Sequence, residues 1–545
     1  MGAYQKNITK IEKNQLFWYY VSMQNDANIK IPEEVKSVVA KLIDSGFGAY
    51  VVGGCVRDLL LGREPDDWDI TTSATPEEIQ NVFPDSFYAN QFLTVTVKTG
   101  SENPSLKEIE VTTYRSEGRY TDKRHPDEVR PAKTLEEDLA RRDFTVNAMA
   151  LSLSRSVNFE IVDLFGGQKD LEQKIIRAVG NPEERFEEDA LRMLRAVRFA
   201  GKFGFSVDEK TYVVIQKNAA WLSAISKERV RDEFVKIVSN ENAKTTIELL
   251  HEAKLLLQMA PELEEGIGID QRGPHKYTVW EHNLRALDYA VSHGFTLRVR
   301  LAALLHDIAK PRVREKRGGI WTFYGHDVVG AKMAYQMLTR LRFSEAESSL
   351  VANLVRWHLF NYKLKRDAQY QKDLAAMGED PSAKDIEDSE EDIEETTDAA
   401  IRRLINRVGA EHIQDLVKVR ICDRIATGVP KAVPYRLRHF QFRVEKILRE
   451  HEATNVKMLA VNGEDVMRAL AIGPGPRVGN LLNALLEEVL DDPAKNTKEI
   501  LENRMRELHA LSDDELKKLR EQSQEKVAGI EEGRIADIKE KYHVK

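Results

Sequence analysis

The first strong pattern in the chain is a short apolar run at residues 49–52 that ends in Gly53 and Gly54. A short apolar run bounded by turn residues is typical of a buried strand. Residues 67–70 then alternate acidic and apolar side chains, Asp-Trp-Asp-Ile. Because strand side chains alternate between two faces, this pattern predicts a second strand from which Asp67 and Asp69 project on the same side.

Two more alternating runs, residues 92–98 and 107–114, predict an antiparallel hairpin, and Glu110 lies on the second run. Helical patterns lie between the strands. One covers residues 56–61, and another begins at Thr75, where Thr-Pro-Glu-Glu supplies an N-cap, a proline in the first turn and a capping-box glutamate. This part of the chain therefore predicts an α+β domain with a small mixed or antiparallel sheet.

Further along the chain the hydrophobic period becomes helical. A strong helix is predicted from Glu188, on which Arg192, Arg195 and Arg198 recur every three residues beside an apolar row. Asp189 lies three residues before Arg192, close enough to pair with it and fix its guanidinium plane. The fold class predicted for the chain is thus α+β, a head with a small sheet followed by all-helical segments.

Length and composition limit what the protein is. A chain of 545 residues is too long for one core, so three or four domains are expected. No apolar run approaches the ~18–20 residues of a membrane span, and the N-terminal residues lack the apolar stretch of a signal peptide. Two cysteines, Cys55 and Cys422, are too few for a disulfide framework. We expect a cytoplasmic protein with no membrane partner.

The net charge of −8 is concentrated in one segment. Residues 379–398 hold eleven acidic side chains and one lysine, so the rest of the chain carries about +2. This composition predicts a disordered insert. Any RNA must therefore bind to local basic patches, because the overall charge does not attract it.

The aspartates and the glycine turn suggest a chemistry. Asp67 and Asp69 repel each other unless a cation neutralises them, and hard divalent ions such as Mg²⁺ prefer carboxylate oxygens. The backbone at Gly54 lets a triphosphate approach closely, and Arg57 supplies positive charge. A phosphate-cradling turn beside a two-metal carboxylate pair is the apparatus of nucleotidyl transfer.

These residues at this spacing resemble the head of class II (bacterial-type) CCA-adding tRNA nucleotidyltransferases and poly(A) polymerases. Residues 141–148, Arg-Arg-Asp-Phe-Thr-Val-Asn-Ala, match a motif of that family. The resemblance implies that Arg142 contacts the triphosphate and that Asp143 and Asn147 shape the sugar pocket. It also implies that Glu110 is a third catalytic carboxylate. Residues 115–131 resemble the loop that the family uses to switch from C to A addition.

The resemblance extends to the helix predicted from Glu188. In the family a Glu-Asp-x-x-Arg motif reads the incoming base without a nucleic-acid template. It implies that Asp189 and Arg192 read the base, while Arg195 and Arg198 hold phosphates or ribose. The implied partners are tRNA, CTP and ATP, the implied cofactor is Mg²⁺, and no DNA partner is expected.

A second set of metal-ligating residue types recurs in or beside apolar segments. The set consists of His282, His306, Asp307, His326, His358 and Asp423. Four histidines and two aspartates in such positions indicate a metal site. The set resembles an HD phosphohydrolase domain. That resemblance implies that the first three and Asp423 bind a second divalent metal, of unknown identity, and that His326 and His358 complete or flank the site.

The predicted organisation follows from these motifs. It is an N-terminal extension (1–30), a nucleotidyltransferase head (31–180), a nucleotide-selecting and RNA-binding neck and body (181–274), an HD domain (275–430) with a disordered acidic insert (366–397), and a tRNA-binding tail (431–545). The expected function is addition of C, C and A to the tRNA 3′ end, with a phosphohydrolase activity of the HD domain. The alternatives are an A-adding enzyme or poly(A) polymerase on the same scaffold, or a protein that is mainly an HD metallophosphohydrolase.

Overall fold

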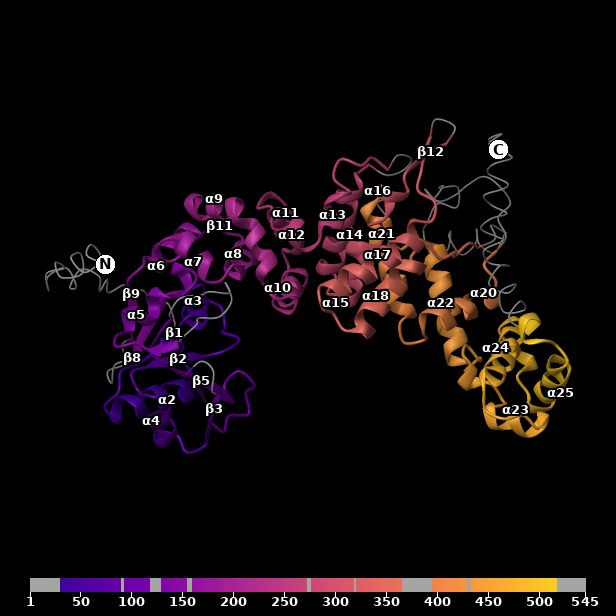
Figure 1. Ribbon diagram of the computed structural model, residues 1–545, viewed down its shortest axis with the longest axis horizontal. Coiled ribbons are helices and arrows are strands. Elements are labelled where there is room, and N and C mark those ends of the chain that lie inside the picture. The colour runs from indigo at the N-terminus through magenta and orange to yellow at the C-terminus, as the bar shows by residue number, and fades with distance from the viewer. Residues whose placement is uncertain are drawn as a thin grey trace. The chain divides into compact units, whose positions relative to one another are not determined.

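The computed structural model describes residues 30–89, 93–117, 129–153, 159–271, 276–317, 320–364, 395–428 and 433–516. The chain divides into two compact units, Met1–Pro261 and Glu262–Lys545 (Figure 1). Several predicted segments lie outside the described residues: nearly all of the N-terminal extension, most of the loop at residues 115–131, nearly all of the acidic insert and the end of the tail.

Seven of the described strands in the first unit form one mixed sheet in the order β3-β4-β5-β2-β1-β8-β9. The strands are β1 (Ala49–Val52), β2 (Asp69–Thr72), β3 (Ser86–Ala89), β4 (Thr94–Lys98), β5 (Glu108–Thr113), β8 (Met149–Leu153) and β9 (Phe159–Asp163). β2 and β5 are parallel, and the other neighbours are antiparallel. The predicted small mixed sheet and the predicted hairpin of β4 and β5 are confirmed.

Short helices cover this sheet. α2 (Glu33–Asp44) and α4 (Pro76–Val82) pack against the sheet and against each other. The predicted capping box is present at the start of α4, where Thr75 and Glu78 each accept a hydrogen bond from the other's backbone N–H. Leu139 of α5 (Leu135–Ala140) packs on Val52 and Ala150. A tight core therefore lies directly beneath the strand ends near the Gly53 turn.

The remainder of the first unit is mainly helical. Its elements are α3 (Gly54–Leu60), η1 (Thr145–Asn147), α6 (Gly167–Gln173), α7 (Pro182–Glu188), α8 (Leu191–Phe203), α9 (Glu209–Asn218), η2 (Ala219–Ala224), α10 (Lys227–Ser239), α11 (Ala243–Glu252) and α12 (Leu256–Met259), with the short strand pairs β6 (Arg115–Glu117) with β7 (Val129–Pro131) and β10 (Ile175–Ile176) with β11 (Ser206–Val207). α8 packs against α10 and α11, burying its apolar row.

The described residues of the second unit are helical apart from one hairpin. Its elements are α13 (Pro261–Glu264, which begins at the boundary), α14 (Val279–Ser292), α15 (Leu297–Leu305), α16 (Lys310–Val313), β12 (Glu315–Arg317), β13 (Ile320–Thr322), α17 (His326–Arg340), α18 (Glu345–Trp357), α20 (Asp398–Val408), α21 (Ile413–Ala426), α22 (Tyr435–Arg449), η3 (Val456–Met458), α23 (Gly463–Leu470), α24 (Pro476–Asp491), η4 (Pro493–Lys495) and α25 (Lys498–His509). α14, α15, α18 and α21 pack around one another, and α23–α25 enclose a separate apolar core. The predicted α+β class, with helical segments after the head, is confirmed.

Two local predictions are wrong. β2 begins at Asp69, so Asp67 precedes the strand, in the bend that leads into it. The helix predicted from Glu188 is two helices, because Asp189 adopts an extended backbone between α7 and α8. As for the membrane, the described residues contain no helix that is both long and apolar enough to cross one.

Candidate nucleotide pocket and metal centre

Three carboxylates meet at the start of β2. In the parallel pairing of β2 with β5, Glu110 lies directly beside Asp69, and Asp67 precedes the strand by two residues. Burial raises the pKa of Asp69 to about 6, and the charges of Asp67 and Glu110 add to the effect, while Arg142 opposes it. Such crowding of negative charge at partly exposed oxygens fits a divalent cation.

The turn after β1 brings a guanidinium to the same place. Gly53 has a φ of +83°, a conformation that glycine tolerates best. A Cβ on Gly53 would lie 2.8 Å from Arg142 Nη1 and 3.6 Å from Asp69 Oδ2. The bare backbone therefore leaves the space in which Arg142 and Asp69 converge, beside the start of α3 at Gly54.

Arg57 lies on α3 and is buried within the protein's own contacts. It donates to Asn147 Oδ1 at 2.6 Å and to both oxygens of Asp58. Its guanidinium also lies over the rings of Phe199 and Phe203, 5.2 and 4.8 Å from their centroids. Arg57 thus holds α3 against η1 and α8, in addition to lining the cavity described below.

A hydrogen-bonded chain links the head to α8. Asn147 Nδ2 donates to Asp143 Oδ1 at 3.0 Å, and Arg195 donates to Asp143 Oδ2 from Nε and Nη2 at 2.9 and 2.6 Å. Burial would raise the pKa of Asp143, but Arg195 and Asn147 outweigh it and hold the pKa at about 2. Asp143 is therefore ionised at neutral pH, and it fixes Arg195.

The predicted pairing of Asp189 with Arg192 is wrong. Arg229 of α10 donates to both oxygens of Asp189, at 3.2 and 2.7 Å. Arg192 donates to Glu188 at 2.8 Å and to the carbonyl of Arg141 at 3.1 Å. The extended backbone at Asp189 explains the difference, because it removes Asp189 from the helical face that Arg192 occupies.

Arg198 is also paired, with a residue far along the chain. Its Nε donates to Glu233 of α10, and both side chains are buried. Burial lowers the pKa of Arg198, whereas the charge of Glu233 opposes that effect. Two ion pairs, at Arg229 and Glu233, thus join α10 to the segment that carries the base-reading candidates.

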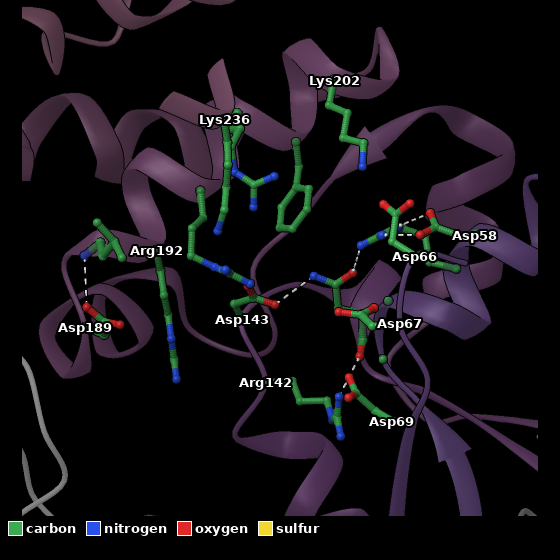
Figure 2. Close-up of a pocket in the computed structure, with 18 of the residues that line it drawn as sticks. Asp58, Asp66, Asp67, Asp69, Arg142, Asp143, Asp189, Arg192, Lys202 and Lys236 are labelled. Atoms are coloured by element: carbon green, nitrogen blue, oxygen red, sulfur yellow. Dashed lines mark hydrogen bonds and ion pairs between the residues drawn. The ribbon is translucent and has the colours of Figure 1, made fainter. Parts of the chain in front are cut away.

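All of these nucleotide-site candidates except Glu110 line one cavity of about 990 Å³. Figure 2 shows Asp67, Asp69 and Arg142 close together on one side of it, with Asp189 and Arg192 on the other side of Asp143. Lys202 and Lys236, which the sequence analysis did not identify, also line the cavity. A volume near 1,000 Å³ suits a nucleoside triphosphate with part of a second substrate.

In the second unit the structure brings all six predicted metal-ligating residues together. His282 lies on α14, His306 and Asp307 follow α15, and Asp423 lies on α21; their ligand atoms lie within 4.8 Å of one another. His326 and His358 form a second such group that shares Asp307. All six side chains are buried.

The histidines of this centre present Nε2 toward its middle. Nδ1 of His306, His326 and His358 lies 2.8, 2.6 and 2.7 Å from the carbonyl oxygens of Ala303, Phe323 and Val355. A carbonyl can only accept, so Nδ1–H donates and Nε2 carries the lone pair. His282 Nε2 lies 2.9 Å from His306 Nε2. Convergent lone pairs oriented by backbone carbonyls are the arrangement of metal-binding histidines.

Asp307 faces both groups at once. Its Oδ2 lies 3.3 Å from His282 Nε2 and 3.4 Å from His306 Nε2, whereas its Oδ1 lies 3.3 Å from His326 Nε2 and 3.8 Å from His358 Nε2. This donor set fits a divalent metal, with one carboxylate between two histidine pairs.

Each aspartate of the centre has a buried cationic partner. Lys310 Nζ lies 2.5 Å from Asp307 Oδ2, and Arg420 Nη1 donates to Asp423 Oδ2 at 2.7 Å. Burial would raise the pKa of Asp307, but Lys310 and the histidines keep it well below its usual range. The carboxylates are therefore ionised and oriented before any ligand binds.

Comparisons with known proteins match the segments that carry the carboxylate cluster and the histidine cluster. Four family models match: the poly A polymerase head domain at residues 49–177, the RNA and SrmB- binding site of polymerase A at 204–267, the HD domain at 279–426 and the tRNA nucleotidyltransferase domain 2 at 422–505. Curated relatives include the CCA-adding enzymes of Lactobacillus helveticus, 45% identical over 251 residues, and of Lactococcus lactis subsp. lactis, 45% identical over 225 residues.

The chain carries a poly A polymerase head domain and an HD domain, and it is similar to CCA-adding enzymes.

The extent of these matches differs between sequence and structure. The two sequence matches cover 43% and 41% of this chain and only 61% and 55% of the relatives. The chain thus spans little more than half the length of the curated relatives it matches. The crystal structure of the Bacillus stearothermophilus CCA-adding enzyme in complex with CTP is similar over 88% of this chain and 97% of that one, with a TM-score of 0.58 and 27% identity.

Proposed function

We propose that this protein is a CCA-adding tRNA nucleotidyltransferase that adds C, C and A to the tRNA 3′ end from CTP and ATP. The observation that carries the proposal is the single cavity lined by Asp67, Asp69, Arg142, Asp189 and Arg192. Catalytic carboxylates, a triphosphate-side cation and base-reading groups are what untemplated nucleotidyl transfer requires.

The head residues prepare the reacting groups. Asp67, Asp69 and Glu110 would hold Mg²⁺, which supplies charge neutralisation at the α-phosphate and a more acidic 3′-hydroxyl. Arg142 Nη1 faces the Gly53 turn and neutralises phosphate charge as pyrophosphate leaves. The new P–O bond forms from the tRNA 3′-oxygen, and the bond between the α-phosphorus and the bridging oxygen to the β-phosphate breaks.

The neck residues would select the base. Arg192 is fixed by Glu188 and by the carbonyl of Arg141, and Asp189 is fixed by Arg229. A guanidinium and a carboxylate, one donor and one acceptor, can match the edges of both cytosine and adenine. Asp143 and Asn147 would lie at the ribose, and Arg195 and Arg198 near the phosphates or the ribose.

The test is 3′-end sequencing of tRNA transcripts that end at the discriminator base, at C or at CC, after incubation with CTP, ATP and Mg²⁺. Completion of all three to CCA, followed by arrest, supports the proposal. Extension of only the CC substrate would assign an A-adding enzyme, and unlimited A tails would assign a poly(A) polymerase. Asp67→Asn should abolish transfer, whereas its neighbour Asp66→Asn should retain it. We place this work in the cytoplasm, where tRNA is matured.

The buried metal centre favours a second activity, hydrolysis of phosphate esters. A bound divalent ion would supply an activated water and stabilise charge on phosphate. His282, His306, Asp307 and Asp423 would hold that ion, while His326 and His358 fit a second one through the other oxygen of Asp307. This activity is tested by measuring release of inorganic phosphate from p-nitrophenyl phosphate in the presence of Mg²⁺, Mn²⁺, Ni²⁺ or Co²⁺. If a His306→Ala variant has the same turnover as wild type, the metal centre is excluded as the site of hydrolysis.

A further inference from the structure

The β12–β13 hairpin follows directly on the first residues of the metal centre. It connects α16 to α17 in the chain, and in Figure 1 it projects from the helices of its own unit. The segment is rich in basic and aromatic residues, Arg-Glu-Lys-Arg at 314–317 and Ile-Trp-Thr-Phe-Tyr at 320–324. Such interleaving is typical of surfaces that bind single-stranded nucleic acid.

Cations and rings share one face of this hairpin. Lys316 and Trp321 are direct cross-strand partners, and Lys316 Nζ lies 5.8 Å from the Trp321 ring centroid. The guanidinium of Arg314, two residues before Lys316, lies 3.9 Å from the same centroid. Arg314 immediately precedes β12, and its guanidinium and the Lys316 ammonium both lie against the Trp321 ring.

The same series continues into the metal centre. Phe323 is two residues after Trp321, and Lys310 Nζ lies 5.8 Å from the Phe323 ring centroid. Lys310 pairs in turn with Asp307, and the Phe323 carbonyl accepts from His326 Nδ1. Cations and aromatic rings therefore lead from the exposed Lys316 to the metal ligands.

Tyr324 adds an exposed ring at the base of the hairpin, with 42% of its surface accessible. A core residue would not be left this exposed, whereas a stacking platform must be. Alternating positive charge and ring faces matches the alternating phosphates and bases of a single strand. A small phosphate ester would use none of these groups beyond Lys310.

We propose that the β12–β13 hairpin is an RNA-binding arm that guides a single-stranded RNA 3′ end bearing a phosphate ester into the metal centre. Bases stack on Tyr324 and on the face of Trp321 that Arg314 does not cover, and Arg314 and Lys316 neutralise backbone phosphates. This inference rests on the proposed hydrolase activity and narrows its substrate class from phosphate esters in general to RNA ends.

The first test separates binding from hydrolysis. Full-length protein in EDTA is irradiated with an eight-nucleotide RNA that carries a 3′-phosphate and 4-thiouridine as its last base, and the crosslinked peptides are identified by mass spectrometry. We expect crosslinks within residues 320–324. Crosslinks confined to other parts of the chain would overturn the proposal, whether or not the centre hydrolyses anything.

The second test uses a KM-against-kcat split with the metal that supports hydrolysis. Trp321→Ala and Lys316→Ala should each raise KM for release of phosphate from the RNA at least about fivefold, with kcat and turnover of p-nitrophenyl phosphate unchanged. Trp321→Phe should restore most of the affinity, and Lys332→Ala, which removes an exposed lysine of α17, should change nothing. An unchanged KM for RNA in Trp321→Ala would refute the arm.

The outcomes also distinguish this inference from the hydrolase proposal. Wild-type protein that cleaves neither compound, yet crosslinks at the hairpin, would retain the RNA-binding arm and exclude the hydrolase. Wild-type protein that cleaves both with no response to the hairpin variants would retain the hydrolase and exclude the arm. CCA addition, measured in parallel, should not change in any of these variants.

Discussion

Replacing Asp69 by Asn should stabilise the metal-free protein, by an amount that grows with pH. The pKa of Asp69 is about 6 in the folded chain, against 3.8 for an unperturbed Asp. Because the folded pKa is raised, Asp69 contributes most favourably below pH 3.8, and that contribution is lost as the pH rises through 6. The two pKa values imply a cost of about 1.5 kcal/mol at pH 5 and about 3 kcal/mol at pH 8, which Asn would remove.

The measured quantity is the free energy of unfolding of the first unit. It is obtained by urea titration in EDTA at pH 5 and pH 8, for wild type and for Asp69→Asn. Asp66→Asn serves as the matched control, because it also removes one negative charge from the cavity wall but is not a member of the carboxylate cluster. Adding Mg²⁺ at pH 8 should stabilise wild type and leave Asp69→Asn unaffected, so that the order of stability reverses.

Two results would refute this reasoning. An equal effect of Asp69→Asn at both pH values would show that its carboxylate is not held in a charge-crowded site. Stabilisation of Asp69→Asn by Mg²⁺ to the same extent as wild type would show that the ion binds elsewhere. Either result would remove the physical basis for placing a catalytic metal at the start of β2.

Three further perturbations test other parts of the two sites. Gly53→Ala places a methyl group 2.8 Å from Arg142 Nη1 on a backbone with φ of +83°. The rate of nucleotidyl transfer should therefore fall at least about a hundredfold while the circular dichroism spectrum stays native. Full activity would show that the close approach of Arg142 to the Gly53 backbone is unimportant. Arg229→Gln should relax discrimination among CTP, ATP and UTP, because Asp189 loses both its hydrogen bonds to that guanidinium; a uniform fall in rate with unchanged selectivity would indicate a merely structural role. Lys310→Met removes a cation that competes with a metal ion for the carboxylate of Asp307. Calorimetric titration with Mn²⁺ should therefore show at least about tenfold tighter binding. Weaker binding would mean that Lys310 instead orients Asp307 for the metal.

Local spacing was enough to predict those parts of the sites that lie within a few residues of each other or on paired strands. The Gly53 turn and the two aspartates are twenty residues apart at most, and the alternation around Glu110 placed it on a strand that pairs with β2. The six residues of the candidate metal centre are predictable because histidine is rare on apolar helices, so its recurrence is a strong signal. The start of β2 is not predictable from the sequence. The alternation of acidic and apolar residues at 67–70 is the same whether all four residues are in the strand or, as observed, the strand begins at Asp69.

Partners across long sequence separations were not predictable in the same way. Arg229 is 40 residues from Asp189, and Glu233 is 35 residues from Arg198. On α10 these charges read as an ordinary solvated face, because the helical period shows which residues share a face but not what that face contacts. Lys202 could have been found, since it continues the basic side of α8 by one more turn.

These long-range pairs explain how a polypeptide could replace a nucleic-acid template. Arg192 is held by Glu188 and by two backbone carbonyls, of Arg185 and Arg141, while Asp189 is held by Arg229 from another helix. A site that hydrogen-bonds the edge of one base rejects a base with a different donor and acceptor pattern, because the buried polar groups of the site are then left unpaired. This free-energy cost arises only if those polar groups cannot turn to new partners. Under the proposed function, rigid anchoring of Arg192 and Asp189 is therefore the condition for selectivity. This anchoring requires the fold of α7, α8 and α10 as a whole rather than the Glu-Asp-x-x-Arg motif alone.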